Sequence, residues 1–225
     1  MNPFDRHALE EGVRLKEQHG GTVVALSMGP PQAEEMLREA ISCGADEAVL
    51  VSDRAFAGAD TWATTYTLAM AIKKIGGCDL VICGKQAIDG DTAQVGPGLA
   101  ERLDRPYASY VRNISDFKDN TFTLERMMDD GYDLLEVPIP ALITVVKDIN
   151  EPRIPSLKGK MKAKKAQITV LNSVDIEADP NLLGLKGSPT QVVKVFAPEL
   201  NSNREMITGT IDEIVLQLFE KLEAV

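Results

Sequence analysis

The chain has 225 residues, 44% of them hydrophobic, and a formal net charge of −10 at pH 7. This length and hydrophobic content predict a globular protein that buries its own core without a metal or disulfide staple. The acidic balance excludes general nucleic-acid binding, because a negatively charged surface repels phosphates.

Cysteine and histidine usage predicts neither a disulfide framework nor a metal centre. The three cysteines, Cys43, Cys78 and Cys83, form no C-x-x-C pair, which is typical of a reducing compartment. His7 and His19 are too few for a zinc-type site or for a Ser/His/Asp constellation, so we assign no metal ligand and no catalytic side chain. The sequence shows no apolar run near the roughly 20 residues of a membrane span and no signal pattern. We expect a cytoplasmic protein without membrane insertion.

The first part of the chain alternates between helical and strand patterns. In chain order the predicted elements are a helix at 4–18, a strand at 22–27, a helix to about residue 42, a strand at 47–51, a helix at 60–75 and a strand at 79–83. This alternation predicts an α/β fold with an open, doubly wound, mostly parallel sheet of the Rossmann-like, adenine-nucleotide-binding type.

After residue 103 the pattern changes. Short strands are predicted at 107–112, 121–125 and 132–136, joined by Asp, Asn and Gly turns, and a buried strand at 141–146. Strands joined by such tight turns predict an antiparallel portion at the edge of the sheet.

From Lys147 onward the chain is predicted to leave the sheet. Residues 147–167 include seven basic and two acidic residues, together with prolines and glycine. We expect a loop followed by an extended arm, although a solvated linker is the usual explanation of a charge run. A terminal helix is predicted over 208–224, with Thr210 and Glu213 forming a capping box. The chain is thus divided into an α/β domain at 1–146 and a second part at 147–225.

The stretch GKQAIDGDTAQVGPGLAERL at 84–103 carries the strongest chemical signal. It follows a predicted strand directly, and a glycine-containing loop that opens a helix presents backbone N–H groups to an anion. Thr92 and Gln94 add side-chain donors, and Gly90 and Gly96 permit close approach of the backbone. These features predict a phosphate site, while an ordinary strand-to-helix turn remains an equal alternative.

The acidic residues of this stretch need a different role. Asp89 and Asp91 would repel a phosphate, so we expect them to cap the helix or to accept hydrogen bonds from ribose hydroxyls. The loop matches neither the Walker motif nor G-x-G-x-x-G, so those nucleotide folds are not predicted.

Four blocks of the chain resemble the beta subunits of electron transfer flavoproteins. KQAIDGDTAQVGP at 85–97 resembles the adenine-nucleotide-binding signature of that family, and residues 2–17, 26–48 and 142–165 resemble three more of its blocks. SDRAFAGADTWATTYTLAMAI at 52–72 resembles the subgroup that carries out flavin-based electron bifurcation. In that subgroup the beta subunit binds a second FAD in place of AMP.

The resemblance implies two sets of site residues. The cofactor-binding set is Asn2, Pro3, Phe4, Asp5, Met28, Asp60, Thr61, Thr64, Gln86, Ala87, Asp89, Gly90, Asp91, Thr92, Ala93, Gln94, Val95 and Gly96. The partner-binding set is Leu157, in the family's recognition loop, with Lys162, Lys164 and Lys165 as its basic flank. Arg126 is expected to face a flavin. The hydroxyls at 61–65 also fit a plain capped helix, which stays open as the alternative.

The resemblance also implies the partners. The C-terminal arm is expected to wrap an electron transfer flavoprotein alpha subunit. Two electrons from NADH are expected to divide between ferredoxin or flavodoxin and, through the alpha-subunit FAD, a flavin-dependent dehydrogenase of the acyl-CoA type or similar. The redox chemistry belongs to the flavin, so whether the chain counts as an enzyme is left open.

Two alternatives remain. The first is a non-bifurcating beta subunit that holds AMP structurally, and the remote second is a stand-alone adenine-nucleotide-binding module. Family members also carry a strand before the position of Asn2, so we expect that strand and part of the adenine pocket to be missing from the present sequence.

Overall fold

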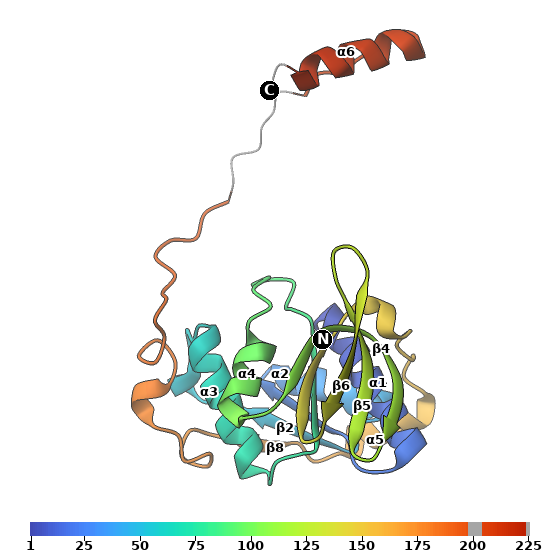
Figure 1. Ribbon diagram of the computed structural model, residues 1–225. Coiled ribbons are helices and arrows are strands. Elements are labelled where there is room, and N and C mark those ends of the chain that lie inside the picture. Colours follow the sequence, from blue (N-terminus) through green and yellow to red (C-terminus); the bar gives the residue numbers. More distant parts are fainter. Residues whose placement is uncertain (198–203, 224–225) are drawn as a thin grey trace. The chain divides into compact units, whose positions relative to one another are not determined.

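The computed structural model describes residues 1–197 and 204–223 of the chain (Figure 1). By its contacts the chain forms two compact units, Met1–Gln191 and Val192–Val225, called here the first and the second unit. The first unit contains α1 (Pro3–His19), β1 (Val24–Met28), α2 (Ala33–Cys43), β2 (Glu47–Val51), η1 (Arg54–Phe56), α3 (Thr61–Lys74), β3 (Leu80–Gly84), α4 (Val95–Leu103), β4 (Tyr107–Lys118), β5 (Thr121–Met127), β6 (Tyr132–Pro138), β7 (Ala141–Val145), η2 (Lys147–Ile149), α5 (Leu157–Lys165), β8 (Thr169–Leu171) and η3 (Pro180–Leu182), and the second contains α6 (Ile211–Glu223).

The strands of the first unit form two hydrogen-bonded sheets, and the predicted α/β class is confirmed. Sheet A has the order β1-β2-β8 and is parallel throughout. Sheet B has the order β3-β7-β4-β5-β6, parallel from β3 to β4 and antiparallel from β4 to β6. The antiparallel portion therefore lies at the edge of the sheet, as the Asp, Asn and Gly turns predicted. A single sheet was predicted, whereas the structure has two, because β1 and β3 are not hydrogen-bonded to each other.

Strands β7 and β2 are the most deeply buried, because each lies between two neighbouring strands and helices pack on their faces. All five residues of β7, ALITV, are buried, and so are four of the five residues of β2. β6 instead alternates between exposed and half-buried positions over most of its length, as expected for a strand with one face in solvent. Helix α1 packs on β3 and β7, while α2 packs on β1 and β2 (Figure 1).

Residues 147–171 differ from the predicted loop and extended arm. Ser156 caps α5 by accepting a hydrogen bond from the Gly159 amide at 3.0 Å. Helix α5 packs against α2, where a side chain on Gly159 would overlap the carbonyl oxygen of Ser42. Strand β8 then pairs with β2 and completes sheet A. The first unit consequently extends to Gln191 and not to the boundary expected after residue 146.

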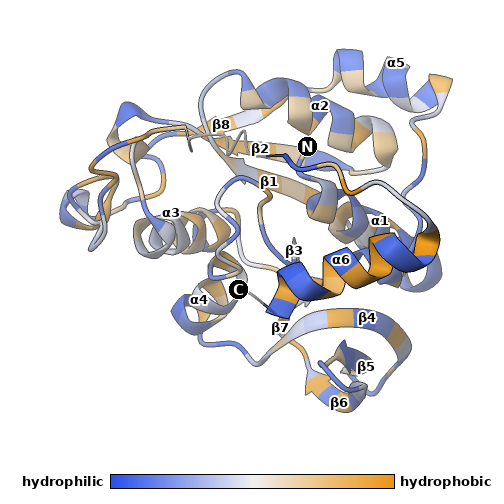
Figure 2. Ribbon diagram, turned by 90° about the horizontal axis from the view of Figure 1, so that it is seen from above, coloured by the Kyte–Doolittle hydropathy of each residue, from blue (hydrophilic) through white to orange (hydrophobic). Residues whose placement is uncertain are grey.

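The second unit contains the predicted terminal helix. The Thr210 amide donates to Glu213 Oε2 at 2.8 Å, and the Glu213 amide approaches Thr210 Oγ1 at 3.5 Å, which confirms the capping box. Apolar and polar residues share this helix (Figure 2). Residue 224, where the prediction ended the helix, lies outside the described residues. None of the described helices is both long enough and apolar enough to cross a membrane.

Candidate functional site

The candidate site lies at the carboxyl ends of β3 and β7. These strands are parallel neighbours, and their registers place Gly84 opposite Val145 at this edge. Residues 85–94, called here the nucleotide loop, connect the end of β3 to the start of α4. Ligands of open α/β sheets bind at this edge, because loops and helix N-termini converge there.

One end of the nucleotide loop is bonded to the start of α1. Asn2 Nδ2 donates to the Gln86 carbonyl at 2.9 Å, and Asn2 Oδ1 accepts from the Ile88 amide at 3.3 Å. Asp5 Oδ1 accepts from the Gly84 amide at 2.8 Å. Asn2 is therefore brought to Gln86, 84 positions away, and Asp5 to Gly84, 79 positions away.

The other end of the loop is bonded to the start of α3. Thr61 Oγ1 donates to Gln94 Oε1 at 2.8 Å. Because Thr61 opens α3 and Gln94 precedes α4, the loop is held between two helix N-termini. The two sequence segments predicted separately, 60–64 and 86–96, thus meet at one place.

The acidic residues of the loop accept hydrogen bonds from groups of the loop itself. Asp89 Oδ1 accepts from the Gly90 amide at 2.8 Å, and the side chain of Gln86 donates to Asp91. Asp91 and Ala93 have positive φ angles of 52° and 53°, which curve the loop tightly. Neither carboxylate caps α4, contrary to one of the two roles expected for them. That Asp89 and Asp91 accept hydrogen bonds from ribose hydroxyls stays a prediction.

The start of α4 fits an anionic group. Gln94, the residue before α4, makes no side-chain capping hydrogen bond, so its side chain leaves the first amides of α4 without a partner. A side chain at Gly96 would overlap Cγ2 of Thr144 on β7, so only glycine lets this helix end lie against the sheet. Uncapped amides with the positive end of the helix dipole are the donors that a nucleotide phosphate requires.

Asp60 has a structural role that occupies its whole carboxylate. Oδ1 accepts from the amides of Trp62 and Ala63 at 2.9 and 3.0 Å, which caps α3. Oδ2 accepts from the amide and hydroxyl of Thr190 at 3.0 and 2.8 Å. Desolvation opposes ionisation, but the hydrogen bonds from Ala63 and Thr190 outweigh it and hold the pKa of Asp60 below its ordinary value. A cofactor contact of this carboxylate stays a prediction.

The remaining predicted cofactor residues are distributed around the loop. Pro3 and the half-buried Phe4 begin α1, Ala87 and Thr92 are exposed on the loop, Val95 begins α4, and Thr64 lies half-buried in the first turn of α3. Met28 is the last residue of β1, where it packs against a cluster that includes Val51, Phe56 and Ile176.

Two lysines of this edge were not predicted from the sequence. Lys85 Nζ lies 5.0 Å from the ring centroid of Tyr110, and Lys147 Nζ lies 5.1 Å from that of Phe4. Lys85 follows β3 directly, and Lys147 lies two residues after the end of β7, so both are at the carboxyl ends of neighbouring strands. That position becomes a signal only once these strands are known to be neighbours. The two lysines supply positive charge beside a loop that otherwise carries carboxylates.

The predicted partner-binding residues lie at a different place. Leu157, at the start of α5, is 78% exposed. Lys162 Nζ donates to the Ala45 carbonyl at 3.0 Å, just before β2 begins, so α5 approaches the amino end of β2. Lys164 and Lys165 are exposed in the last turn of α5. The structure does not bring this group to the nucleotide loop, which lies at the carboxyl ends of the strands.

Arg126, on β5, is paired only in part. Its Nη2 donates to Asp133 Oδ2 at 2.7 Å. Its Nε is buried and has no hydrogen-bond partner within the described residues. Arg126 therefore keeps a donor that its own surroundings leave unused.

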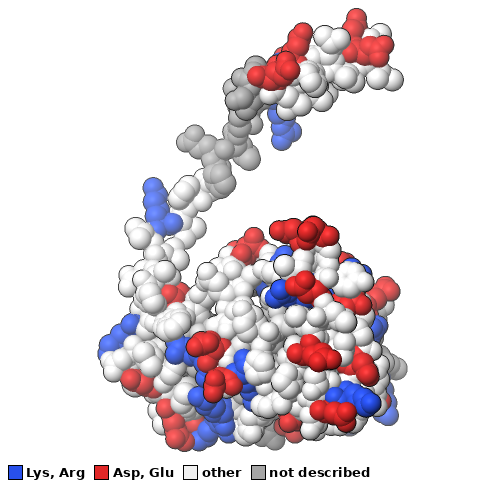
Figure 3. Space-filling model, in the orientation of Figure 1, with Lys and Arg blue, Asp and Glu red and all other residues white. Residues whose placement is uncertain are grey.

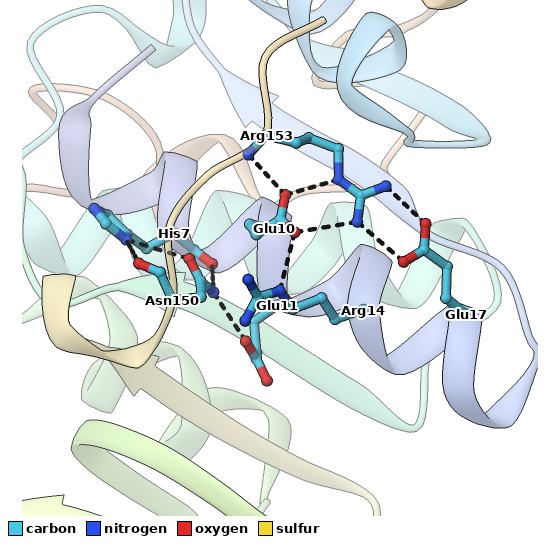
Figure 4. A network of polar contacts seen from close by, with 7 residues as sticks. All are labelled: His7, Glu10, Glu11, Arg14, Glu17, Asn150 and Arg153. Carbon is cyan, nitrogen blue, oxygen red and sulfur yellow. Dashed lines mark hydrogen bonds and ion pairs between the residues drawn. The ribbon is translucent and has the colours of Figure 1, made fainter. Parts of the chain in front are cut away.

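A network of polar contacts joins the chain before α5 to helix α1 (Figure 4). Arg153 forms paired contacts with Glu10 and with Glu17. Burial would raise the pKa of Glu10, but the hydrogen bonds from Arg153 and Arg14 hold it below the ordinary value. On the face drawn in Figure 3, acidic and basic side chains lie side by side.

Comparison with known proteins shows the family of the chain. A family profile described as "Electron transfer flavoprotein domain" matches residues 1–176. The electron transfer flavoprotein subunit beta of Thermoanaerobacterium thermosaccharolyticum is 50% identical over 225 residues, covering 100% of this chain and 86% of that protein. The caffeyl-CoA reductase-Etf complex subunit CarD of Acetobacterium woodii is also 50% identical, over 99% of this chain and 86% of that protein. The acryloyl-CoA reductase electron transfer subunit gamma of Anaerotignum propionicum is 43% identical, over 99% of this chain and 85% of that protein. The chain belongs to the electron transfer flavoprotein family, on the side of its beta subunits.

Proposed function

We propose that the chain binds FAD at the nucleotide loop and acts, with an alpha subunit, in flavin-based electron bifurcation. The observation that carries this proposal is the contact between Thr61 and Gln94, which joins the start of α3 to the nucleotide loop. That contact unites the segment resembling the bifurcating subgroup with the segment resembling the nucleotide signature.

Each group of residues has a stated part in this function. The amides at the start of α4 would hold a phosphate, and Lys85 and Lys147 would balance its charge. Asn2 and Asp5 fix the loop that shapes the site. A bound FAD would supply the redox chemistry, accepting two electrons from NADH and releasing them separately to two acceptors.

The partners follow from two further surfaces. The apolar side of α6 is proposed to bind the alpha subunit, because its large apolar side chains are exposed in the chain alone. Leu157 with the lysines of α5 is proposed to dock on a flavin-dependent dehydrogenase of the acyl-CoA type. The names of the relatives from Acetobacterium and Anaerotignum, which refer to acyl-CoA reductases, support that choice. Ferredoxin or flavodoxin is proposed as the second acceptor.

One observation favours a second candidate, a non-bifurcating subunit that holds AMP. The carboxylate of Asp60 is fully used within the protein, so the start of α3 offers few free groups to a larger ligand. AMP would need only the phosphate site at α4 and the loop around it.

The test measures where NADH electrons go. The complex with the alpha subunit is mixed with NADH, ferredoxin and an acyl-CoA dehydrogenase with its enoyl-CoA. Bifurcation predicts that ferredoxin is reduced only while the enoyl-CoA is also reduced. If the complex fails to oxidise NADH yet exchanges electrons with the dehydrogenase, the AMP candidate is the right one.

A further inference from the structure

The segment between η2 and α5 is held by side chains and not by its own backbone. Within the described part of the chain, residues 151–155 make no backbone–backbone hydrogen bond. The segment Asn150–Pro155, called here the docking loop, would therefore be loose if only its backbone fixed it.

Arg153 fixes this loop to helix α1. Its amide and Nε donate to Glu10 Oε2 at 3.0 and 2.8 Å, and its Nη2 donates to Glu10 Oε1 at 3.1 Å. Nη1 and Nη2 also donate to the two oxygens of Glu17 at 2.7 and 3.0 Å. Both sides of the guanidinium thus bind a carboxylate in paired contacts, as Figure 4 shows. Planar, paired contacts of this kind determine position as well as affinity.

A second anchor lies at the beginning of the docking loop. Asn150 Nδ2 donates to the His7 carbonyl at 3.0 Å and to Glu11 Oε2 at 2.8 Å. Glu10 is only 5% exposed, so its contact with Arg153 is protected from solvent better than a surface ion pair. His7, Glu10, Glu11 and Glu17 recur at helical spacing and turn one face of α1 toward the loop (Figure 4).

Apolar packing contributes little to the position of the loop. A cavity of about 220 Å³ lies beside it, lined by Pro152, Arg153, Ile154 and Pro155 of the loop and by residues of α1 and α2. The side chain of Ile154 is 88% exposed. Pro155 restricts Ile154 to an extended backbone. Arg153, the residue before Ile154, is held by its contacts with Glu10 and Glu17. Ile154 is therefore a large apolar side chain in solvent, carried by a backbone that is constrained on both sides.

The exposed apolar surface continues into α5. Leu157 is followed one turn later by Met161, which is 56% exposed and lies on the same side of the helix. Lysines at positions 158, 160, 164 and 165 surround these side chains in the sequence. An apolar centre with a basic rim fits a protein partner that has an apolar pocket and a carboxylate rim.

We propose that Ile154 is a second apolar docking contact beside Leu157, and that Arg153 is the positioning residue that holds it ready for the partner dehydrogenase. This inference rests on the proposed function, in which α5 docks on an acyl-CoA-type dehydrogenase. Ordering the loop before the encounter removes an entropic cost of binding, so the clamp should lower the KM and leave the kcat unchanged.

The test varies the concentration of the complex with the alpha subunit against an acyl-CoA dehydrogenase. Arg153→Gln and Ile154→Ala are each expected to raise the KM at least fivefold with the kcat unchanged. Arg153→Lys keeps the charge but loses the fork, so its KM should fall between those of Arg153→Gln and the native chain. Arg14→Gln is the matched control: Arg14 also contacts Glu10, at 3.0 Å, but both residues lie on α1. Its KM should stay within twofold of the native value.

A double mutant separates positioning from direct contact. If Arg153 acts by holding Ile154, the variant Arg153→Gln/Ile154→Ala is no worse than the poorer single variant. Amide hydrogen exchange of residues 150–156 should also quicken in Arg153→Gln and not in Arg14→Gln, with no partner present. Multiplying effects in the double variant, or unchanged exchange, would overturn the positioning role.

Leu157→Ala distinguishes this inference from the function on which it rests. If Leu157→Ala raises the KM while the Arg153 and Ile154 variants do not, the present inference is wrong and the docking surface stands. If all three variants leave the KM unchanged, the dehydrogenase does not dock here, and both are wrong.

Discussion

Gly96 and Gly90 lie in the same segment but have different surroundings. A side chain at Gly96 would overlap Thr144, whereas nothing lies within 4 Å of the corresponding position at Gly90. Gly96→Ala should lower the free energy of unfolding by about 1–3 kcal/mol, the range for overpacking, and should reduce the nucleotide bound by the complex. Urea denaturation and nucleotide extraction measure the two effects.

Gly90→Ala is the matched variant. Its free energy of unfolding should stay within about 0.5 kcal/mol of the native value, as for exposed substitutions. If the loop binds a nucleotide through close backbone approach, its nucleotide content should nevertheless fall. Equal destabilisation by both substitutions would contradict the packing described at Gly96.

Asp60 predicts a particular pH dependence. Its pKa is lower in the folded chain than its ordinary value, so its charge stabilises the fold above that value and ceases to do so as the pH falls through the folded pKa. Asp60→Asn retains a capping side chain but carries no charge. The stability difference between native chain and variant should be below about 1 kcal/mol near neutral pH.

Urea denaturation between pH 7 and pH 3 follows this difference. It should shrink once the pH is below about 4, where the Asp carboxyl of the unfolded chain is protonated. A difference that stays constant over this range would show that the charge of Asp60 does not stabilise α3.

At the residue scale, the sequence identifies residue types better than their contacts. Gln94 and Thr61 were both predicted to bind a cofactor, but only the fold shows that they bind each other. The cap that Asp60 forms on α3 is local, whereas its bonds to Thr190 depend on a segment 130 positions away. Lys85 and Lys147 were missed because a lysine after a strand has no distinctive pattern until neighbouring strands are placed.

Helix α5 leads to a prediction about electron transfer. Leu157→Ala should change the free energy of unfolding by no more than about 0.5 kcal/mol, because the side chain is exposed. It should leave flavin content unchanged and slow electron delivery to the dehydrogenase by roughly tenfold, the effect of losing a docking contact worth more than about 1 kcal/mol. Stopped-flow mixing of the reduced complex with the oxidised dehydrogenase measures the rate.

Val174→Ala provides the control for Leu157. Val174 is 81% exposed and lies in a turn after β8, outside the proposed docking surface. Its electron transfer rate should equal that of the native chain. A rate for Leu157→Ala that matches this control would remove α5 from the docking surface.

Helix α6 offers a pair of leucines on different sides. Leu218 lies on the apolar stripe formed at helical spacing with Ile211, Val215 and Leu222, and Leu216 lies off it. Leu218→Asp should weaken association with the alpha subunit at least tenfold, a loss of about 1.4 kcal/mol or more. Leu216→Asp introduces the same charge and should have little effect, as measured by calorimetry or co-purification. Equal effects would show that the stripe is not the contact surface.

At the element scale, buried strands and capped helices could be predicted well. The strand at 47–51 and the capping box of α6 were found where the patterns placed them. Helix α5 was missed because its residues are mostly lysine and only Ala163 is buried, so it has no clear apolar face. Strand β8 was missed because its three residues join a sheet edge that no local pattern reveals.

At the scale of the whole molecule, helix α1 connects the two proposed surfaces. Its first residues bond to the nucleotide loop, and its Glu10 and Glu17 hold Arg153 of the docking loop. The family and the class of fold could be predicted from the sequence, because four blocks carry the likeness. The division into two sheets could not be predicted, since it depends on which strands are hydrogen-bonded and not on where strands occur.

The most direct test of the account is the nucleotide content of the complex co-expressed with its alpha subunit. Bound nucleotides are extracted, separated and counted per heterodimer. The account predicts two FAD and no AMP, with one FAD lost when Gly96 is replaced by alanine. One FAD with one AMP would contradict the bifurcating function, and one FAD with no second nucleotide would contradict the site at the nucleotide loop.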